Sequence, residues 1–307
     1  MKILITGGAG FQGSHLSEYL SGKGHEITIL NTWSENSERN INSFRNKIRV
    51  IWGSITDPEI VKKSIRGQDT VIHLAARINV DESISDPGSY IDVNVKGTLN
   101  ILEGVKENDC RLIHASTCEV YGAPENKILI DERTELRPYS PYAASKAGAD
   151  RLCFAYHKTF GTKVTIVRPF NIYGEKQKEG LGGALIAIFV KKALNGENLK
   201  VFGKGEQTRD YLHISDLVKA YELVLNNEDL IGETLNFGTG KETSIKDIAE
   251  FIASKMGSKV EFADARKGEV ERFACDNTKA EKYGFNPSVD IWDGISKYID
   301  WRKSLKS

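Results

Sequence analysis

Short apolar segments alternate with amphipathic ones along the first half of the chain. Apolar runs rich in β-branched residues, typical of buried strands, lie at residues 2–6, 26–30, 48–52, 70–74, 111–115 and 163–167. Stretches with helical spacing separate most of them, notably at 87–105 and 141–160. This alternation predicts an α/β fold, a doubly wound parallel sheet with helices on both faces.

The pattern changes after residue 170. Glycines cluster at 174–183, and a strand at 234–237 is expected to return to the main sheet. Helices are predicted at 184–194, from 215 onward, and at 245–256, 278–283 and 291–301. We therefore expect a first domain over residues 1–170, with a return of about 211–238, and a smaller C-terminal substrate-binding domain mainly over 171–307.

A glycine-rich turn joins the first predicted strand to a helix. Gly7, Gly10 and Gly13 have the spacing G-x-x-G-x-x-G, and Leu16 and Leu20 continue with helical periodicity. Glycines permit close backbone approach, and the free N–H groups of a helix start bind a pyrophosphate. The strand–turn–helix order therefore predicts a dinucleotide site in a Rossmann-type fold.

The adenosine end of this site departs from the usual pattern. Asn31 stands at the end of the second strand, where an acidic residue usually binds the ribose. An amide does not repel a 2′-phosphate, and Arg39 and Arg45 lie nearby in the sequence, although both arginines also suit a solvated loop. NAD is the expected cofactor, and NADP is not excluded.

The charge balance argues against nucleic acid or an anionic membrane as the main partner. The chain has 42 basic and 42 acidic residues and a formal net charge of zero, whereas both partners need a basic surplus. No apolar run approaches the ~20 residues of a membrane span, and the start of the chain does not resemble a signal peptide. Four cysteines without C-x-x-C spacing predict no metal site. A cytoplasmic protein is the expectation.

Candidate catalytic residues gather around the fifth strand and the helix after it. Tyr142 and Lys146 are four residues apart, so on a helix they share a face, and a neighbouring cation favours a phenolate base. Thr117, Cys118 and Glu119 follow the strand at 111–115. Ligands bind at the carboxyl ends of such strands, so these groups are expected beside the tyrosine.

These motifs together resemble the extended short-chain dehydrogenase/reductase family, in its NAD-dependent nucleotide-sugar epimerase/dehydratase branch. The resemblance covers essentially the whole length. It rests on TGGAGFQG at 6–13, HLAA at 73–76, NVKGT at 94–98, STCEVYG at 116–122, YAASK at 142–146, RPFNIYG at 168–174 and QTRDYLHISD at 207–216.

The resemblance implies roles for individual residues. Thr117, Tyr142 and Lys146 match the family's catalytic triad. The positions implied around the cofactor are Gly7, Gly10, Phe11, Gln12, Gly13, Asn31, Ser54, Ile55, Leu74, Ala75, Ala76, Asn94, Tyr142, Lys146 and Pro169. Ser54, like Asn31, is neutral where the family often has an aspartate. Those implied at the sugar nucleotide are Asn171, Arg209 and Arg266.

The pair Cys118–Glu119 bears on the branch of the family. The family's 4,6-dehydratases often carry Asp-Glu here, and their glutamate removes the C5 proton. Glu119 matches that base, and a thiol, protonated at neutral pH, can replace the acid. A dehydratase of the 4,6 or 5,6 type, acting on a UDP-, dTDP- or GDP-hexose such as UDP-GlcNAc, is the first hypothesis. A UDP-hexose C4-epimerase is second, followed by a UDP-glucuronate decarboxylase and a non-catalytic dinucleotide sensor.

Plainer interpretations remain for several of these residues. Cys118 also suits a small buried filler, and Glu119 an exposed strand-end carboxylate. His73 and His114 are expected to be satisfied core histidines, and Asp81, Glu82 and Asp86 to form a solvated loop face. The helices around 87–105 and 141–160 resemble those of the family's dimer interface. A homodimer is predicted, with the seam Ile91, Val95, Leu99 and Leu102, which equally suit the core.

Overall fold

The computed structural model describes residues 1–123, 129–177, 184–265 and 271–305. The chain forms two compact units that are interleaved in sequence. The first holds Met1–Val120, Leu136–Arg168 and Val218–Leu235, and the second holds Tyr121–Glu135, Pro169–Leu217 and Asn236–Ser307. The predicted boundary at residue 170 lies close to the end of the second segment of the first unit.

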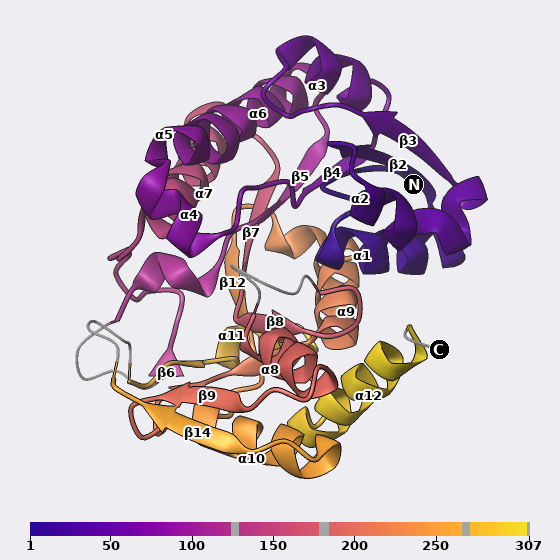
Figure 1. Ribbon diagram of the computed structural model, residues 1–307. Helices are drawn as coiled ribbons and strands as arrows, with labels where there is room; N and C mark the ends of the chain where they lie inside the picture. Colours follow the sequence, from indigo (N-terminus) through magenta and orange to yellow (C-terminus); the bar gives the residue numbers. More distant parts are fainter. Residues whose placement is uncertain (124–128, 178–183, 266–270, 306–307) are drawn as a thin grey trace. The chain divides into compact units, whose positions relative to one another are not determined.

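A seven-stranded sheet forms the centre of the first unit, with the order β12-β7-β5-β4-β1-β2-β3 (Figure 1). The strands are β1 (Lys2–Thr6), β2 (Glu26–Asn31), β3 (Ile48–Trp52), β4 (Thr70–His73), β5 (Arg111–Ala115), β7 (Val164–Pro169) and β12 (Thr234–Phe237). Neighbours from β3 to β7 pair in parallel. The strand order reverses between β1 and β4, which is where doubly wound sheets bind ligands. The predicted Rossmann-type sheet is confirmed.

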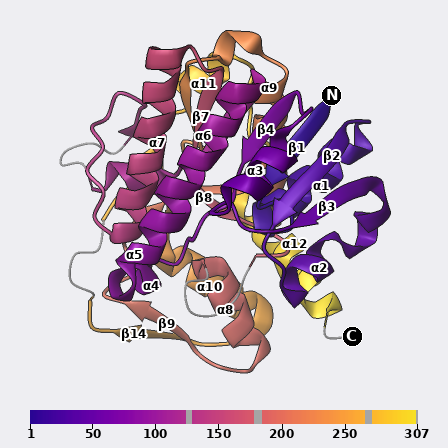
Figure 2. The ribbon, with the colours of Figure 1, turned by 90° about the horizontal axis from the view of Figure 1, so that it is seen from above.

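Helices cover both faces of this sheet. On one face α3 (Pro58–Ile65), α6 (Gly97–Asn108) and α7 (Pro141–Phe160) lie side by side (Figure 2). Their apolar residues share a core with the strands that includes Val61, Ile101 and Leu112. On the opposite side lies α1 (Phe11–Gly22), where Tyr19 donates a hydrogen bond to Glu222 of α9 (Ile214–Leu225) at 2.5 Å. The sheet is therefore buried between two helical layers, as its apolar strands predict.

The helix expected over residues 87–105 is present, but it contains a turn of a different type. It consists of α5 (Pro87–Tyr90), a π-helical turn η2 (Ile91–Lys96) and α6. Such π-helical turns are rare in proteins, and those that occur are often found at functional sites. Of the proposed dimer seam, Leu102 is fully buried in the core of the first unit, whereas Ile91 and Leu99 are 44% and 38% exposed. Leu102 is therefore a core residue, and the homodimer stays a prediction.

The segment read as a solvated loop is also helical. Residues Val80–Ser85 form α4, whose N-terminus is capped by Asn79, and the side chain of Asp86 caps α5. The loop interpretation was wrong because Asp and Asn side chains that accept from backbone N–H groups start helices as readily as they solvate loops. The first unit also holds α2 (Glu35–Ile41), η1 (Asn42–Lys47), η3 (Cys118–Tyr121, with Tyr121 in the second unit) and η4 (Glu228–Leu230).

The second unit combines four two-stranded sheets with four helices among the described residues. The strand pairs are β10 (Thr208–Arg209) with β13 (Thr243–Ser244), β11 (Tyr211–His213) with β8 (Asn171–Tyr173), β14 (Val260–Ala263) with β9 (Leu199–Phe202), and β15 (Ala274–Cys275) with β6 (Leu129–Ile130). The helices are α8 (Leu185–Leu194), α10 (Ile245–Met256), α11 (Thr278–Lys282) and α12 (Ile291–Ser304). A separate apolar core that includes Phe189, Ile252 and Tyr298 holds this unit together.

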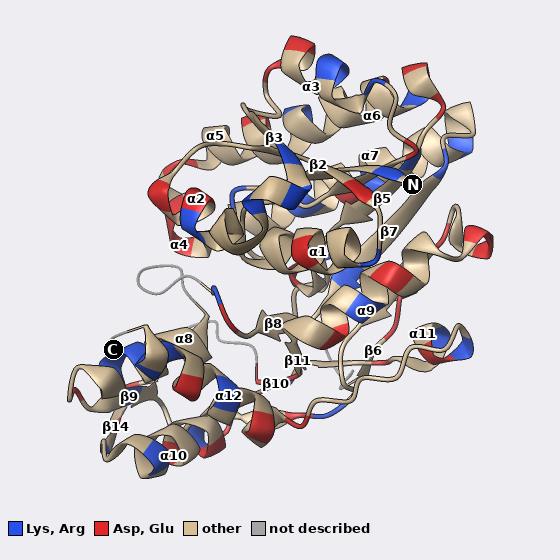
Figure 3. Ribbon diagram, turned by 90° about the vertical axis from the view of Figure 1, so that its right-hand side faces the viewer, with Lys and Arg blue, Asp and Glu red and all other residues tan. Residues whose placement is uncertain are grey.

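Charged residues of both signs share the same helices. Figure 3 shows lysine or arginine and acidic residues together on α3 and on α10. Within the described ranges, none of the helices has both the length and the apolar character that a membrane crossing requires.

Candidate active site

The glycine loop between β1 and α1 is shaped by the absence of side chains. Gly7 has φ +71°, and a Cβ there would lie 2.8 Å from the backbone nitrogen of Ala75. A Cβ on Gly13 would lie 2.1 Å from the carbonyl oxygen of Gly7. Gly10 donates its N–H to the same oxygen at 2.9 Å, and α1 begins at the next residue without a side-chain cap. The first N–H groups of α1, including those of Phe11 and Gln12, are thus available to an anion, so the loop fits a dinucleotide pyrophosphate.

Asn31 braces this loop from the end of β2. Its side-chain oxygen accepts from the N–H of Ala9 at 3.2 Å, and its amide donates to the carbonyl of Thr32 at 2.7 Å. The hydroxyl of Ser54 makes a local contact with Thr56 at 2.7 Å. Both neutral residues therefore have partners within the protein, and their predicted roles toward adenosine stay predictions.

The end of β4 lies against the glycine loop. The hydroxyl of Thr6 accepts from the N–H of Ala75 at 3.2 Å and hydrogen-bonds His73 at 2.6 Å, while the second ring nitrogen of His73 contacts Thr98 at 3.0 Å. Burial, with a smaller effect of the Lys146 charge, lowers the pKa of His73 to about 3. His73 is therefore a neutral, satisfied core histidine, as expected. The segment Leu74–Ala76 follows β4 beside the glycine loop, and its role toward the cofactor stays a prediction.

The structure brings the three triad residues together. Tyr142 lies in the first turn of α7, where Ser140 caps the helix and Pro141 occupies its first position. Its hydroxyl is hydrogen-bonded to Thr117, which follows β5. Lys146 lies one helical turn further along, and its ammonium donates to the carbonyl of Ala115 at 2.5 Å. The shared helix face predicted for the tyrosine and the lysine is confirmed.

Burial is the largest cause of the pKa shifts of Tyr142 and Lys146. The pKa of Tyr142 is raised above its ordinary value, chiefly by burial and then by the charge of Glu119, while the hydrogen bond with Thr117 lowers it. Burial lowers the pKa of Lys146 to about 8. Removal from water penalises the charged form of both groups, and the predicted effect of the lysine charge on the phenol stays a prediction.

Cys118 and Glu119 occupy the 3₁₀ turn η3, directly after Thr117. Glu119 is exposed, and its backbone N–H donates to the hydroxyl of Thr117 at 3.3 Å. Cys118 is buried. Both raise the pKa of Tyr142 when they are negatively charged, so both lie close to its phenol.

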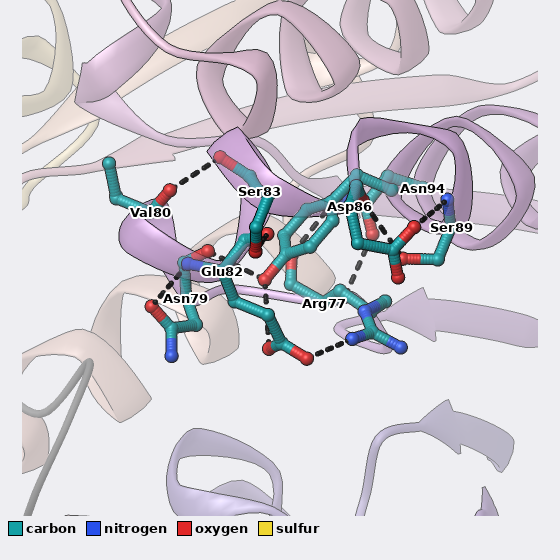
Figure 4. Close-up of polar contacts among 10 residues, drawn as sticks. Arg77, Asn79, Val80, Glu82, Ser83, Asp86, Ser89 and Asn94 are labelled. Carbon is teal, nitrogen blue, oxygen red and sulfur yellow. Dashed lines mark hydrogen bonds and ion pairs between the residues drawn. The ribbon is translucent and has the colours of Figure 1, made fainter.

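Two contacts hold the start of α7 against the segment that follows β4. The side-chain amide of Asn94 donates to Ser145 at 2.8 Å and to the backbone oxygen of Arg77 at 3.0 Å, and its oxygen accepts from the Arg77 N–H at 2.8 Å. The hydroxyl of Ser83 accepts from the backbone N–H of Tyr142 at 3.0 Å and donates to Val80 at 2.6 Å. Figure 4 shows Ser83, Val80, Asn94 and Arg77 in this network.

The aromatic ring of Tyr90 packs beside the catalytic tyrosine. The ring of Tyr90 meets that of Tyr142 edge-on at 6.4 Å, and its hydroxyl donates to the carbonyl of Asn79 at 2.6 Å. Arg77 lies over the Tyr90 ring. It also pairs with Glu82 (Figure 4). Sequence reasoning missed Ser83 and Tyr90, since neither lies in a motif that marks a contact to α7, whereas Ser145 could have been noticed inside the Y-x-x-x-K segment.

The residues expected to bind the sugar nucleotide belong to the second unit. Asn171 donates to the carbonyl of Asp210 at 2.9 Å, and Arg209 donates to the carbonyl of Thr208 at 2.7 Å. Pro169 also falls in this unit. Arg266 lies outside the described residues. The described residues contain no group of three or more His, Cys, Asp or Glu side chains that could hold a metal ion.

A doubly wound sheet with a glycine loop at the switch point and a Tyr–Lys pair beside it defines a dinucleotide-binding α/β enzyme. Comparison with known proteins narrows this class. The GDP-mannose 4,6 dehydratase family model matches residues 4–298. The chain therefore belongs to the extended short-chain dehydrogenase/reductase family of NAD-dependent nucleotide-sugar epimerases and dehydratases.

The relatives include dehydratases, epimerases and decarboxylases. A Methanocaldococcus jannaschii protein, named provisionally as a UDP-glucose 4-epimerase, is 36% identical over 98% of both chains. A dTDP-glucose 4,6-dehydratase from Streptomyces niveus is 36% identical over 100% of this chain and 94% of the relative. The structure of DesIV, a dTDP-glucose 4,6-dehydratase from Streptomyces venezuelae solved with NAD bound, superposes with a TM-score of 0.91 at 32% identity, covering 100% of this chain and 98% of that one.

Proposed function

We propose that this protein is an NAD-dependent nucleotide-sugar dehydratase. The observation that carries the proposal is the position of Glu119. Its exposed carboxylate lies two residues after Thr117 in the chain and close enough to Tyr142 for its charge to raise the pKa of that phenol. A base at this place suits a carbon next to the one whose hydroxyl the tyrosine deprotonates.

The cofactor site supports NAD. Gly7 and Gly13 leave a cradle that a Cβ would fill, and α1 begins there without a side-chain cap. Lys146 and Asn94 border the nicotinamide end in this proposal. Bound NAD supplies the acceptor for the hydride that leaves C4, and its positive ring favours the phenolate form of a nearby tyrosine.

The chain's own residues move the proton in the oxidation. Tyr142 takes the proton of the 4-hydroxyl, and Thr117, hydrogen-bonded to the same phenol, orients the 4-oxygen. Lys146 stabilises the phenolate by its positive charge, which is present below its pKa of about 8. The phenol pKa is raised in this structure, so the tyrosine depends on these neighbours to act near neutral pH.

Elimination follows from the 4-ketone, which acidifies the C5 proton. Glu119 takes that proton, and the C6 hydroxyl leaves as water with a proton donated by Cys118. The two steps together remove one water molecule and leave the sugar with an unsaturated bond at C5. In a 4,6-dehydratase the C5–C6 double bond would then be reduced, with hydride at C6 and a proton at C5, whereas in a 5,6-dehydratase the C4 ketone would be reduced instead.

A C4-epimerase is the second candidate, favoured by the burial of Cys118. A buried thiol suits a packing role as well as a proton donor, and one of the relatives at 36% identity carries an epimerase name. An epimerase needs only Tyr142, Thr117 and Lys146. A non-catalytic dinucleotide sensor ranks lower, because a sensor has no use for the assembled triad. A UDP-glucuronate decarboxylase also ranks below the epimerase.

Asn171, Arg209 and Arg266 are proposed to bind the sugar nucleotide and its diphosphate. Asn171 and Arg209 carry N–H donors, and a guanidinium is the side chain best suited to phosphate. We also propose a homodimer and a cytoplasmic location. Sedimentation that finds only monomer at micromolar concentration would contradict the dimer.

The test is mass spectrometry of products formed in deuterated water. UDP-GlcNAc, UDP-glucose, UDP-glucuronate, dTDP-glucose and GDP-mannose are each incubated with the protein and NAD. Loss of one water establishes a dehydratase, and solvent deuterium at C5 with a 4-ketone then identifies the 4,6 route. Unchanged mass with a new C4 epimer by NMR identifies the epimerase instead.

The substitution Glu119→Gln separates the two roles of this carboxylate. Water elimination should be abolished, while oxidation at C4 stays detectable as NADH absorbance. Because the Glu119 charge raises the pKa of Tyr142, the acidic limb of C4 oxidation should also move to lower pH. Full dehydratase activity in this variant would show that Glu119 is not the base.

A further inference from the structure

Two buried polar side chains at the end of β5 lack hydrogen-bond partners among the described residues. His114 is fully buried, and neither of its ring nitrogens is bonded. The hydroxyl of Ser116 is buried and unbonded in the same way. The expectation of a satisfied core histidine is therefore wrong for His114. Buried polar groups are nearly always paired with protein or with ordered water, so this pair needs an explanation.

The two side chains point to the same side of the sheet. Ser116 continues the strand pairing, because its N–H donates to the carbonyl of Val167 at 2.7 Å. Side chains alternate along a strand, so Ser116, His114 and Leu112 share a face, and Leu112 packs in a core with Cys153 of α7. Their Cα atoms are about 6.6 Å apart, a spacing compatible with one water molecule bonded to both side chains.

His114 and Ser116 lie close to the catalytic lysine, Lys146. Ala115, between the two residues, accepts the hydrogen bond of the Lys146 ammonium. The charge of Lys146 is also among the causes that lower the pKa of His114, so the ammonium lies close to the ring. His73, whose ring lies 5.3 Å from that of His114, has both nitrogens bonded and cannot take this role.

We propose that His114 and Ser116 bind one internal water molecule on the α7 side of β5, and that this hydration site positions and solvates the Lys146 ammonium. His114 is then a positioning residue that acts through Lys146. The link to catalysis rests on the proposed function, whereas the water site does not.

The site offsets part of the cost of burying the lysine. Burial lowers the pKa of Lys146 to about 8, and a water dipole favours the cation. The other ionisable groups coupled to Lys146 by charge are His73 of β4 and Asp150 and Cys153 of α7, and Arg168 of β7 acts on His114. Asp150 favours the ammonium through its charge, while its carboxylate is hydrogen-bonded to Arg168 and Arg151.

The structural test is a high-resolution crystal structure of the protein with NAD. A water within about 3.2 Å of both a His114 ring nitrogen and the Ser116 hydroxyl supports the proposal. A direct bond between the two side chains, or a dry site, overturns it. This readout is independent of turnover, so it holds even if no tested sugar nucleotide reacts.

The functional test uses His114→Phe, which keeps the ring volume without the nitrogens, and Ser116→Ala. In both variants the alkaline limb of the kcat/KM profile, which reports Lys146, should move down by about one pH unit. His114→Gln should restore it. Thr162→Val is the matched control, because it removes another buried, unbonded hydroxyl beyond the far end of α7.

The pH dependence of NADH binding gives the same limb without any sugar substrate. If that limb stays in place in Ser116→Ala and in His114→Phe, the proposal is wrong. If the limb moves but no sugar nucleotide reacts, the hydration site is supported and the proposed function fails.

Discussion

The helices α1 and α7 both begin at the active site. The first N–H groups of α1 have no side-chain cap, whereas those of α7 are capped by side chains. At α1 the cap position is Gly10, which offers no side chain to the helix. At α7, Ser140 accepts from Ala143, Pro141 has no N–H to satisfy, and Ser83 of α4 accepts from Tyr142. The uncapped start suits a bound phosphate, whereas the capped start fixes a side chain in place.

The difference shows how one fold builds two kinds of site. The glycine loop depends on empty space, so its sequence is restricted to residues without a Cβ. The catalytic helix depends on side chains from separate segments, since Ser83, Asn94 and Thr117 all bond residues of α7. Substitutions at the start of α1 should therefore weaken cofactor binding, whereas substitutions at the start of α7 should lower turnover.

The largest loss of activity is expected from a substitution at the start of α7. Tyr142→Phe removes the hydroxyl that bonds Thr117 and should lower kcat by about 10³-fold, within the range of general acid–base catalysis. Tyr156→Phe is the control on the same helix, because Tyr156 bonds Glu103 instead. Steady-state turnover measures both. Comparable losses in the two variants would show that the helix, and not the phenol, is at issue.

Gly13→Ala tests the uncapped start. The new Cβ would clash with the carbonyl of Gly7, and such overpacking costs about 1–3 kcal/mol, or roughly 5- to 150-fold in NAD affinity. Gly22→Ala, at the other end of α1, meets nothing within 4 Å and should leave NAD binding unchanged. Calorimetric titration measures both affinities. Tight NAD binding by Gly13→Ala would show that the loop adapts.

Ser83→Ala tests whether a cap contributed from α4 matters to catalysis. It leaves the Tyr142 N–H unbonded, and we expect kcat to fall about 10-fold, in line with the 1–3 kcal/mol cost of an unsatisfied buried group. KM should change little, and Ser83→Thr should recover activity. Ser140→Ala, which removes the helix's own cap, should lower Tm with a smaller loss of kcat. Equal kcat losses would mean that both caps only stabilise the helix.

Asn31→Asp should have the smallest effect. A carboxylate still accepts from the N–H of Ala9, so the loop keeps its brace. Its charge repels a 2′-phosphate, so NADP affinity should fall by about 5-fold relative to NAD, roughly 1 kcal/mol. Parallel titrations with the two cofactors measure the ratio. An unchanged ratio would place the ribose away from residue 31.

Local chemistry along the chain was enough to predict the sheet, the glycine turn and the pairing of Tyr142 with Lys146. Each depends on short-range rules: apolar runs form strands, glycine alone fits Gly7 and Gly13, and a four-residue step keeps two side chains on one helix face. The π-helical turn at Ile91–Lys96 escaped prediction because the sequence there reads as an ordinary helix.

Only the tertiary structure decided what surrounds these residues. Ser83 meets Tyr142 across 59 positions of sequence, and Asn94 meets Ser145 across 51. Burial, which no local pattern measures, raises the pKa of Tyr142 and lowers that of Lys146. It also leaves His114 without a partner among the described residues. The sequence by itself determined which groups can react, and folding determined how far each is removed from water, because desolvation depends on every element packed around it.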